Sequence, residues 1–436
     1  MSRQKISVWL LVFLPLLLRG AEERFDLQHF VNLAVQNSQG IQIVEEAVNG
    51  AEQKITESKS LYYPQVSLAA AYSRLSLVSE FDINLGGQPM HFKFMSPNSY
   101  SLRLAASQQI FNWGRTQKTV QMSRLGVTLA EDAAAAVRQL TAYQVVPIYY
   151  NLLFAREALQ VLDETRDLFA RKLNILKTRF EAGLASDYDI SLIQVQMSAI
   201  DSQKADLNNL VSKLILTYNR IANRPLTAEL NIDDRLDSQT LAVDEQQLLR
   251  EALANRVEFK QLRDQEALLS TQADLARTGN KPNLMAAFTY EFRNGFLPSV
   301  DQLRGNWTLS LSAVYPLFDG FRTRAQVNQA EIGLSTVRRQ RLDQESAVAA
   351  EIRQLVSDLK TLEEKAAIEK IKMGHAQRTL NIAEERSPRG LASTTDLIEA
   401  QNTVANSRLS ILQLTVNYVL NRYSLFRAVG RKIYQE

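Results

Sequence analysis

The sequence predicts an α+β membrane protein built by internal duplication, with four short membrane strands and two long helical hairpins per chain. Three observations support this fold class. Similar landmarks recur in the same order in the two halves of the 436-residue chain. The helical stretches are longer than globular domains usually hold, and four short segments alternate apolar with polar residues. Together these features favour an elongated molecule with one pole in a membrane.

The first residues have the pattern of a secretory signal peptide, which we assign to residues 1–21. Arg3 and Lys5 form a charged start, Ile6 to Leu18 form an apolar run, and Gly20 and Ala21 are small residues suited to cleavage. That run is too short to span a bilayer, and an amphipathic N-terminal anchor is the alternative interpretation. No later segment is apolar for long enough to form a transmembrane helix. The sequence therefore predicts an exported chain.

Two copies of the tetrapeptide GLAS mark equivalent points of a duplicated unit. One lies in "RFEAGLASDYDI" and the other lies 207 residues later in "RSPRGLASTTDL". Upstream, "QQIFNWGRTQKTV" and "YPLFDGFRTRAQV" recur with the same offset, and "YYPQVSLAAAYSR" and "NKPNLMAAFTYEF" recur with an offset of 218. The offsets differ because of a loop, where insertions cost little. We expect a first repeat over residues 22–225 and a second over residues 226–436.

Four segments are predicted to be strands that are apolar on one side and small or polar on the other. The first repeat has a pair at about 63–74 and 99–109, and the second has a pair at about 282–292 and 306–316. Segments of about ten residues with aromatic residues at their ends are typical of outer-membrane strands. A soluble sheet packed on one face would show the same period. The export signal leads us to favour the membrane.

Four strands cannot close a barrel, and lipid does not tolerate an open sheet edge. Several chains must therefore share one barrel, and three chains would supply about twelve strands. The segments within the two strand pairs, "LSLVSEFDINLGGQPMHFKFMSP" and "RNGFLPSVDQLRG", have the character of external loops.

Long helical patterns follow each strand pair. Residues 115–180 contain one proline, Pro147, which should kink or interrupt the helix, and residues 322–386 contain none. At 1.5 Å per residue, each stretch would be roughly 100 Å long. Heptad-like apolar seams support extended helix packing, although an ordinary helix-bundle core would give a similar pattern. The seams comprise Ile193, Met197, Ile200, Leu207, Val211, Leu214 and Tyr218, with Lys204 intruding; Ile352, Leu355, Leu359, Leu362 and Ala366; and Leu397, Ala400, Val404, Ser407, Ile411, Leu414 and Tyr418.

Each GLAS tetrapeptide has the chemistry of a tight bend between two helices. A glycine suits the left-handed position that ends a helix, and a serine followed three residues later by aspartate forms a capping box at the next helix. The residues concerned are Gly183, Ser186 and Asp189 in the first bend and Gly390, Ser393 and Asp396 in the second. Both bends are therefore expected at the pole opposite the strands.

The composition argues against catalysis and against nucleic-acid binding. The net charge is +3 and basic residues are interspersed with acidic ones, so no basic face is available for a nucleic acid. Cysteine is absent, and His29, His91 and His375 lie far apart. Phosphate-loop, dinucleotide and nucleophile-elbow motifs are missing. We expect no enzymatic activity, no cofactor and no metal site.

The order of signal peptide, duplication, strand pairs and GLAS hairpins resembles the TolC family of outer-membrane efflux proteins. The resemblance covers nearly the whole chain from about Glu22 onward. It implies a homotrimer with a shared twelve-stranded β-barrel among the lipids of a Gram-negative outer membrane. A long periplasmic α-helical coiled-coil barrel would hold most of the mass. An equatorial region would include short helices around Phe25 to Ser58 and Val243 to Asn255. Family members export small molecules or proteins together with a periplasmic adaptor and an inner-membrane transporter.

The resemblance also implies two sites. Asp396 and Glu399 match the carboxylates that line the family's closed periplasmic aperture, and three chains would place six of them around the opening. The first hairpin has Asp189 but Leu192 at the second position, so one ring of pairs is expected. Turn chemistry, helix capping and a solvated glutamate would explain the same residue types. The tips that meet the adaptor would be Gly183, Leu184, Ala185 and Ser186 with Gly390, Leu391, Ala392 and Ser393.

Two departures from the family concern gating. Ser387 stands where the best-known member has an aromatic residue, and Pro388 should bend or end the helix before the second tip. We predict a passive trimeric exit duct, opened at its periplasmic tip by an adaptor and an inner-membrane pump. The alternative is a periplasmic adaptor, or a structural coiled-coil protein of the envelope, without a membrane barrel.

Overall fold

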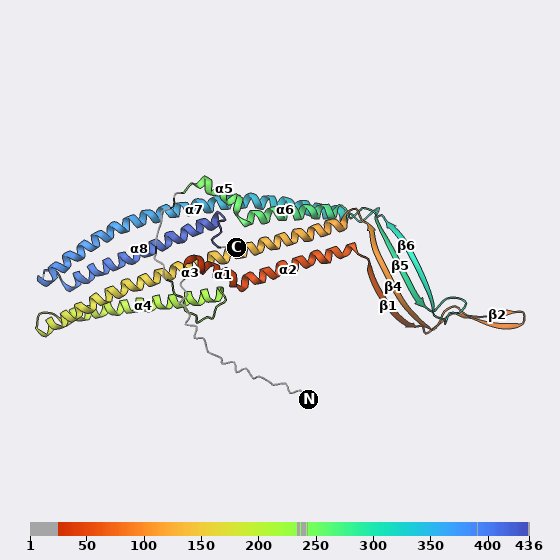
Figure 1. Cartoon of the computed structure of the whole chain (residues 1–436), viewed down its shortest axis with the longest axis horizontal. Helices are drawn as coiled ribbons and strands as arrows, with labels where there is room; N and C mark the ends of the chain where they lie inside the picture. Colours follow the sequence, from red (N-terminus) through yellow and green to blue (C-terminus); the bar gives the residue numbers. More distant parts are fainter. Residues whose placement is uncertain (1–24, 233–235, 237–240, 242, 390, 435–436) are drawn as a thin grey trace, which may run out of the picture.

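The computed structural model describes residues 25–232, 236, 241, 243–389 and 391–434. The molecule is elongated, with a four-stranded sheet at one end and the tips of two helical hairpins at the other (Figure 1). The α+β architecture and the internal duplication predicted from the sequence are confirmed. The expected signal peptide, residues 1–21, and Gly390 lie outside the described residues.

The first half of the chain runs from the middle of the molecule to the sheet, then to the far tip and back. Helices α1 (Leu27–Asn37) and α2 (Gln39–Lys59) and the 3-10 turn η1 (Ser60–Tyr62) lead to strand β1 (Gln65–Arg74). A ribbon of β2 (Glu80–Leu85) and β3 (Gln88–Lys93) precedes β4 (Asn98–Phe111), which pairs with β1. The 67-residue helix α3 (Arg115–Glu181) reaches the tip, and α4 (Asp187–Ile221) returns along it.

The second half repeats this path. Helices α5 (Glu245–Asn255) and α6 (Val257–Ala276) lead to β5 (Asn283–Arg293) and β6 (Arg304–Val314). The 65-residue helix α7 (Arg322–Arg386) and the 3-10 turn η2 (Ser387–Arg389) reach the second tip, and α8 (Thr394–Ala428) returns.

Two constant offsets relate the halves residue by residue. Adding 218 to the bounds of α1 gives those of α5, and adding 207 to the bounds of α4 gives those of α8. The left-handed pair Trp113–Gly114 recurs 207 residues later as Gly320–Phe321. Strand register follows the same rule: Gln65 faces Ser107, and Asn283 (65 + 218) faces Val314 (107 + 207). The duplication is therefore preserved in local geometry as well as in the order of elements.

The sheet is antiparallel, with the order β1-β4-β5-β6, so β1 and β6 form its edges (Figure 1). Between Arg74 and Asn98 lie 23 residues (75–97), and between their counterparts Phe292 and Gly305 lie 12 (293–304), which accounts for the difference of 11 between the offsets. The longer segment contains the β2–β3 ribbon, which projects beyond the sheet (Figure 1). The sequence predicted only a loop here, and that prediction was wrong. Gly86 and Gly87, with φ of 66° and 89°, supply a turn between two alternating runs.

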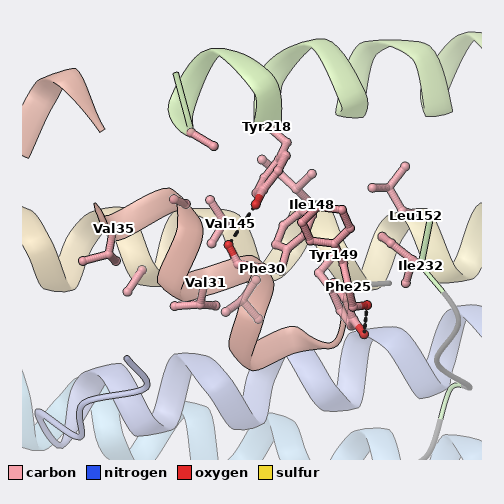
Figure 2. Close-up of a cluster of buried hydrophobic side chains, with 14 of the residues drawn as sticks. Phe25, Phe30, Val31, Val35, Val145, Ile148, Tyr149, Leu152, Tyr218 and Ile232 are labelled. Carbon is pink, nitrogen blue, oxygen red and sulfur yellow. Dashed lines mark hydrogen bonds between the residues drawn. The ribbon is translucent and has the colours of Figure 1, made fainter. Parts of the chain in front are cut away.

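The largest buried cluster lies in the middle of the molecule, where α1 crosses α3 and α4 (Figure 2). The rings of Phe30 and Tyr218 stack with centroids 3.6 Å apart, and the Tyr218 hydroxyl donates to the Phe30 carbonyl at 3.0 Å. The Tyr149 hydroxyl donates to the Phe25 carbonyl at 3.4 Å. Burial of each such ring contributes about 2–3 kcal/mol. This cluster fixes α1 across the base of the first hairpin.

The predicted seams are buried or half-buried along the helix pairs. Ile193 and Ile200 face α3, while Lys204 forms an ion pair with Asp163 of α3 at the edge of the seam. Pro147 does not interrupt α3, which continues through it. Helix α2 is not a short equatorial helix, because its 21 residues lie along α3 toward the sheet (Figure 1).

Candidate functional site

The first hairpin tip begins where a Schellman motif ends α3. The amide of Leu184 donates to the Arg179 carbonyl and that of Gly183 donates to the Phe180 carbonyl, each at 2.8 Å. Gly183 has a φ of 72°, a left-handed value that favours glycine strongly. The chain therefore turns sharply without leaving carbonyls of the last helical turn unpaired.

A capping box then starts α4. The Ser186 hydroxyl accepts from the Asp189 amide at 3.2 Å, and the Asp189 carboxylate accepts from the Ser186 amide at 3.3 Å. Hydrogen bonds from the Ser186 hydroxyl and from Thr394 lower the pKa of Asp189. Because Thr394 belongs to α8, this interaction also joins the two tips.

The second tip uses the same chemistry with one difference. The Leu391 amide donates to the Arg386 carbonyl at 3.2 Å, as Leu184 does to Arg179. The Ser393 hydroxyl accepts from the Asp396 amide at 3.1 Å, and the Asp396 carboxylate accepts from the Ser393 amide at 2.9 Å. However, α7 ends at Arg386, two residues before the counterpart of the last residue of α3. That counterpart is Pro388, so the helix ends before it, as the sequence predicted.

A groove of about 530 Å³ separates the two tips within one chain. Lys172 of α3 and Glu384 of α7 lie across it, with Nζ and Oε1 3.6 Å apart. Burial lowers the pKa of Lys172, and the nearby carboxylate opposes that shift. Apolar side chains of Ile175, Leu176 and Leu397 form part of the walls. The groove therefore combines an apolar lining with a half-buried cation.

Asp396 and Glu399 lie together on the exposed side of α8, one turn apart. Ile398 is buried against α3 and α4, and Ala400 is buried against α7. Hydrogen bonds from the backbone and the hydroxyl of Ser393 lower the pKa of Asp396, so its carboxyl stays ionised near neutral pH. In the first hairpin, Leu192 is half-buried at the position that corresponds to Glu399. Of the two matching pairs of positions, only Asp396 and Glu399 therefore supply two exposed carboxylates.

The sheet at the opposite pole has two chemically different faces. On one face, cross-strand neighbours are apolar, as in the row Leu68, Leu104, Tyr290 and Trp307. The other face carries mostly small and polar residues, with an ion pair between Arg103 Nη2 and Glu291 Oε1 at 2.7 Å. Leu68 and Leu309 are each 69% exposed in the single chain. An apolar face of this extent is typical of strands that face lipid.

Aromatic side chains gather at both ends of the apolar face. Tyr72 and Tyr100 lie at the end near the ribbon, with ring centroids 5.1 Å apart. At the helical end, Phe111 contacts Trp113, and Tyr315 and Phe318 are exposed. Such rings mark the two interfaces of a membrane strand region.

Sequence reasoning missed several polar contacts that depend on which elements are neighbours. The pairs Lys172–Glu384 and Arg103–Glu291 join residues from different halves of the chain. For Arg103 a signal was present, since it occupies a polar position of an alternating strand. For Lys172 no sequence signal distinguishes it from other lysines of α3. Among the described residues, no helix combines the length and hydropathy of a membrane-spanning helix.

An amphipathic membrane-type sheet at one pole and long helical hairpins at the other define a subunit of an outer-membrane channel. Residues 30–220 and 248–431 match the family described as outer membrane efflux protein. The outer membrane protein TolC of Escherichia coli (strain K12) is 22% identical over 397 residues, which cover 88% of this chain and 77% of that protein. The pyoverdine export outer membrane protein OpmQ of Pseudomonas aeruginosa is 21% identical over 414 residues, with 93% and 85% covered.

Solved structures show the same fold. The Campylobacter jejuni CmeC outer membrane channel matches with a TM-score of 0.76 at 18% identity, over 93% of this chain and 85% of that one. The open state of the Neisseria gonorrhoeae MtrE outer membrane channel matches with a TM-score of 0.75 at 14% identity, over 94% and 90%.

The chain therefore belongs to the outer membrane efflux protein family. It is an outer-membrane protein that provides an exit duct for efflux, and it is not an enzyme. The comparisons give no support to a periplasmic adaptor or a structural coiled-coil protein of the envelope.

Proposed function

We propose that three copies of this chain form one duct, in which the β6 edge of each subunit pairs with the β1 edge of the next. The observation that carries the proposal is a four-stranded sheet with one apolar face and two unpaired edges. Unpaired backbone groups are costly in lipid, and closing three such sheets into one barrel of about twelve strands removes every edge. The polar faces would then line the lumen.

The helical hairpins would continue this barrel as a tube through the periplasm. In this arrangement residues 1–21 are removed on export, and residues 22–225 and 226–436 each supply one sixth of the wall. A passive duct of this kind needs no cofactor and derives its direction of transport from an inner-membrane transporter.

The tips would be the contact for a periplasmic adaptor. Leu184 is 78% exposed and Leu391 is 71% exposed, and the amide of each donates a hydrogen bond to a carbonyl of the preceding helix. An exposed apolar residue on a hydrogen-bonded turn makes an effective anchor, because less conformational entropy is lost on binding when the backbone is already fixed. The groove beside Lys172 would receive part of the adaptor between the two hairpins of one subunit.

Asp396 and Glu399 would form the charged ring of the periplasmic aperture. Six carboxylates around a narrow opening favour cations and repel each other, so closure is opposed unless other contacts or partners stabilise it. The lowered pKa of Asp396 keeps its part of the ring ionised near neutral pH.

Reversal potentials of the purified duct in planar bilayers under a salt gradient test the aperture. The variant Asp396→Asn with Glu399→Gln removes charge but keeps acceptor oxygens for the helix cap. We expect cation selectivity to fall by at least about twofold, as expected when a charge ring sets selectivity. Glu385→Gln, an exposed carboxylate on α7, is the matched control. An unchanged reversal potential in the double variant would remove both residues from the pore.

A further inference from the structure

The duplication makes one junction between the two halves visible and implies a second one between chains. Within the chain, the halves meet where β4 pairs with β5 and α3 packs against α6. The counterparts of β4 and α3 are β6 and α7, and those of β5 and α6 are β1 and α2. In the described part of the chain, α7 does not pack against α2, and β6 does not pair with β1. These surfaces would meet in the proposed trimer, on which the inference rests.

The strand register supports the use of the two offsets to derive contacts between subunits from contacts observed within one chain. The two offsets convert the observed register between β1 and β4 into the observed register between β5 and β6. Applied to the β4–β5 pairing, in which Leu104 faces Tyr290, they place Leu311 opposite Tyr72 of the partner subunit. Both lie on the apolar face of their strands. The transferred register therefore keeps the two faces of the sheet continuous across the subunit boundary.

The visible helix junction is centred on a buried carboxylate. Asp132 of α3 is 1% exposed, and its Oδ1 lies 2.6 Å from Lys260 Nζ of α6. Asp264, one turn further along α6, lies beside Asp132. Lys118 pairs with Asp274 at the end of the same junction, at 3.0 Å, which fixes the antiparallel register of the two helices.

The counterparts of Asp132 and Asp264 carry opposite charges, whereas the counterparts of Lys260, Lys118 and Asp274 are the uncharged residues Gln42, Ala325 and Thr56. Asp132 corresponds to Arg339 (132 + 207), and Asp264 corresponds to Glu46 (264 − 218). Both are exposed in the single chain, and among the described residues neither has an ion-pair partner. Among the described residues, the side chain of Glu46 accepts one hydrogen bond, from Asn49 of its own helix at 3.3 Å. A carboxylate pair inside the chain is thus replaced by a cation and an anion.

An apolar residue lies one helical turn from each of these charged residues, Leu342 from Arg339 and Ile43 from Glu46. Leu342 of α7 is 58% exposed, and Ile43 of α2 is 68% exposed. Their counterparts, Ala135 of α3 and Gln261 of α6, belong to the two helices that pack at the visible junction, and both are half-buried. Ala135 is half-buried there, whereas Leu342 is uncovered. Two large apolar side chains are therefore exposed on helices whose counterparts in the other half of the chain pack against each other.

From these observations we infer that Arg339 of each subunit forms an ion pair with Glu46 of the partner subunit, beside a contact between Leu342 and Ile43 of the partner subunit. The occupant of the α7 surface is a second copy of this chain. The opposite charges specify which helices meet and in what register, because the like-charged alternative is unfavourable. The junction between chains would thereby differ chemically from the junction within a chain.

Charge reversal tests this pair. Glu46→Arg or Arg339→Glu alone should reduce the fraction of trimer in mild detergent by roughly tenfold near the midpoint of dissociation. Combining both substitutions should restore it, which a merely structural effect of either residue would not produce. Glu52→Arg is the matched control on α2, because its counterpart Ser270 is exposed in α6. Additive losses in the double variant would overturn the inference.

Chemical cross-linking gives an independent result, since the chain has no cysteine. A variant with Glu46→Cys and Arg339→Cys, treated with a short bismaleimide, should give covalent dimers and trimers on denaturing gels. A variant with Glu52→Cys and Arg339→Cys should remain largely monomeric there. Trimers by native mass without the expected cross-link would refute the ion pair and leave the duct intact. A monomer by native mass would refute the duct itself.

Discussion

At the scale of single residues, the capping boxes hold the hairpin tips in shape. Replacing Ser186 or Ser393 by Ala removes the acceptor for the Asp189 or Asp396 amide and should cost about 1 kcal/mol of local stability. Hydrogen exchange of amides in the first turn of α4 or α8 should therefore accelerate by about fivefold. Ser198→Ala, within α4, is the control, because its hydroxyl bonds only a helical carbonyl. Equal exchange in all three variants would contradict a role for the caps.

The buried carboxylates predict a dependence of stability on pH. Burial and the neighbouring Asp132 raise the pKa of Asp264 above its usual value of 3.8, so the folded chain binds this proton more tightly than the unfolded chain does. Stability from this group is fully present below the unfolded pKa and is lost as pH rises through the folded pKa. Asp264→Asn should therefore raise the melting temperature at pH 7 and leave it unchanged at pH 3. Asp206→Asn, on the exposed face of α4, should have no effect at either pH.

Residue chemistry could be predicted where it is local and not where it depends on neighbours. The serine–aspartate spacing predicts the capping boxes, because their partners lie three residues apart. The contact of Asp132 with Lys260 could not be read from the sequence, because 128 residues separate them. Their roles follow only from the packing of α3 against α6.

At the scale of elements, the β2–β3 ribbon is an insertion that the barrel should not need. The second half joins the counterparts of Arg74 and Asn98 with 12 residues (293–304) in place of 23. Replacing residues 75–97 by a copy of 293–304 should leave the trimer fraction and single-channel conductance of the open duct within about twofold of wild type, since long insertions contribute little to stability. Deleting 65–74 in the same protein is the control and should abolish the trimer, because it removes the β1 edge. Loss of the trimer in the loop exchange would show that the ribbon takes part in assembly.

Long periodic elements were predictable, and short ones were not. The two long helices and the four sheet strands carry many repeats of their period. The ribbon carries only six residues per strand, and its Gly86–Gly87 turn between alternating runs was the available signal. Helix α2 is amphipathic, but the sequence does not show which helix covers its apolar side, so its course along α3 was not evident.

At the scale of the whole molecule, one physical conflict leads to the assembly. The single chain exposes an apolar sheet face and two strand edges, which neither water nor lipid accommodates together. The sequence already contained this conflict, because the alternation and the number of strands follow from local pattern. The residue-by-residue correspondence of the halves could be established only from the structure, because the two offsets had to be compared with the observed strand registers.

The mass of the protein extracted from outer membranes in mild detergent, measured by native mass spectrometry, tests the central claim most directly. The shared-barrel duct predicts a particle of three chains that requires detergent to remain in solution. A monomer or dimer that stays soluble after detergent is removed would contradict it, because its strands could not then be closing a barrel in lipid.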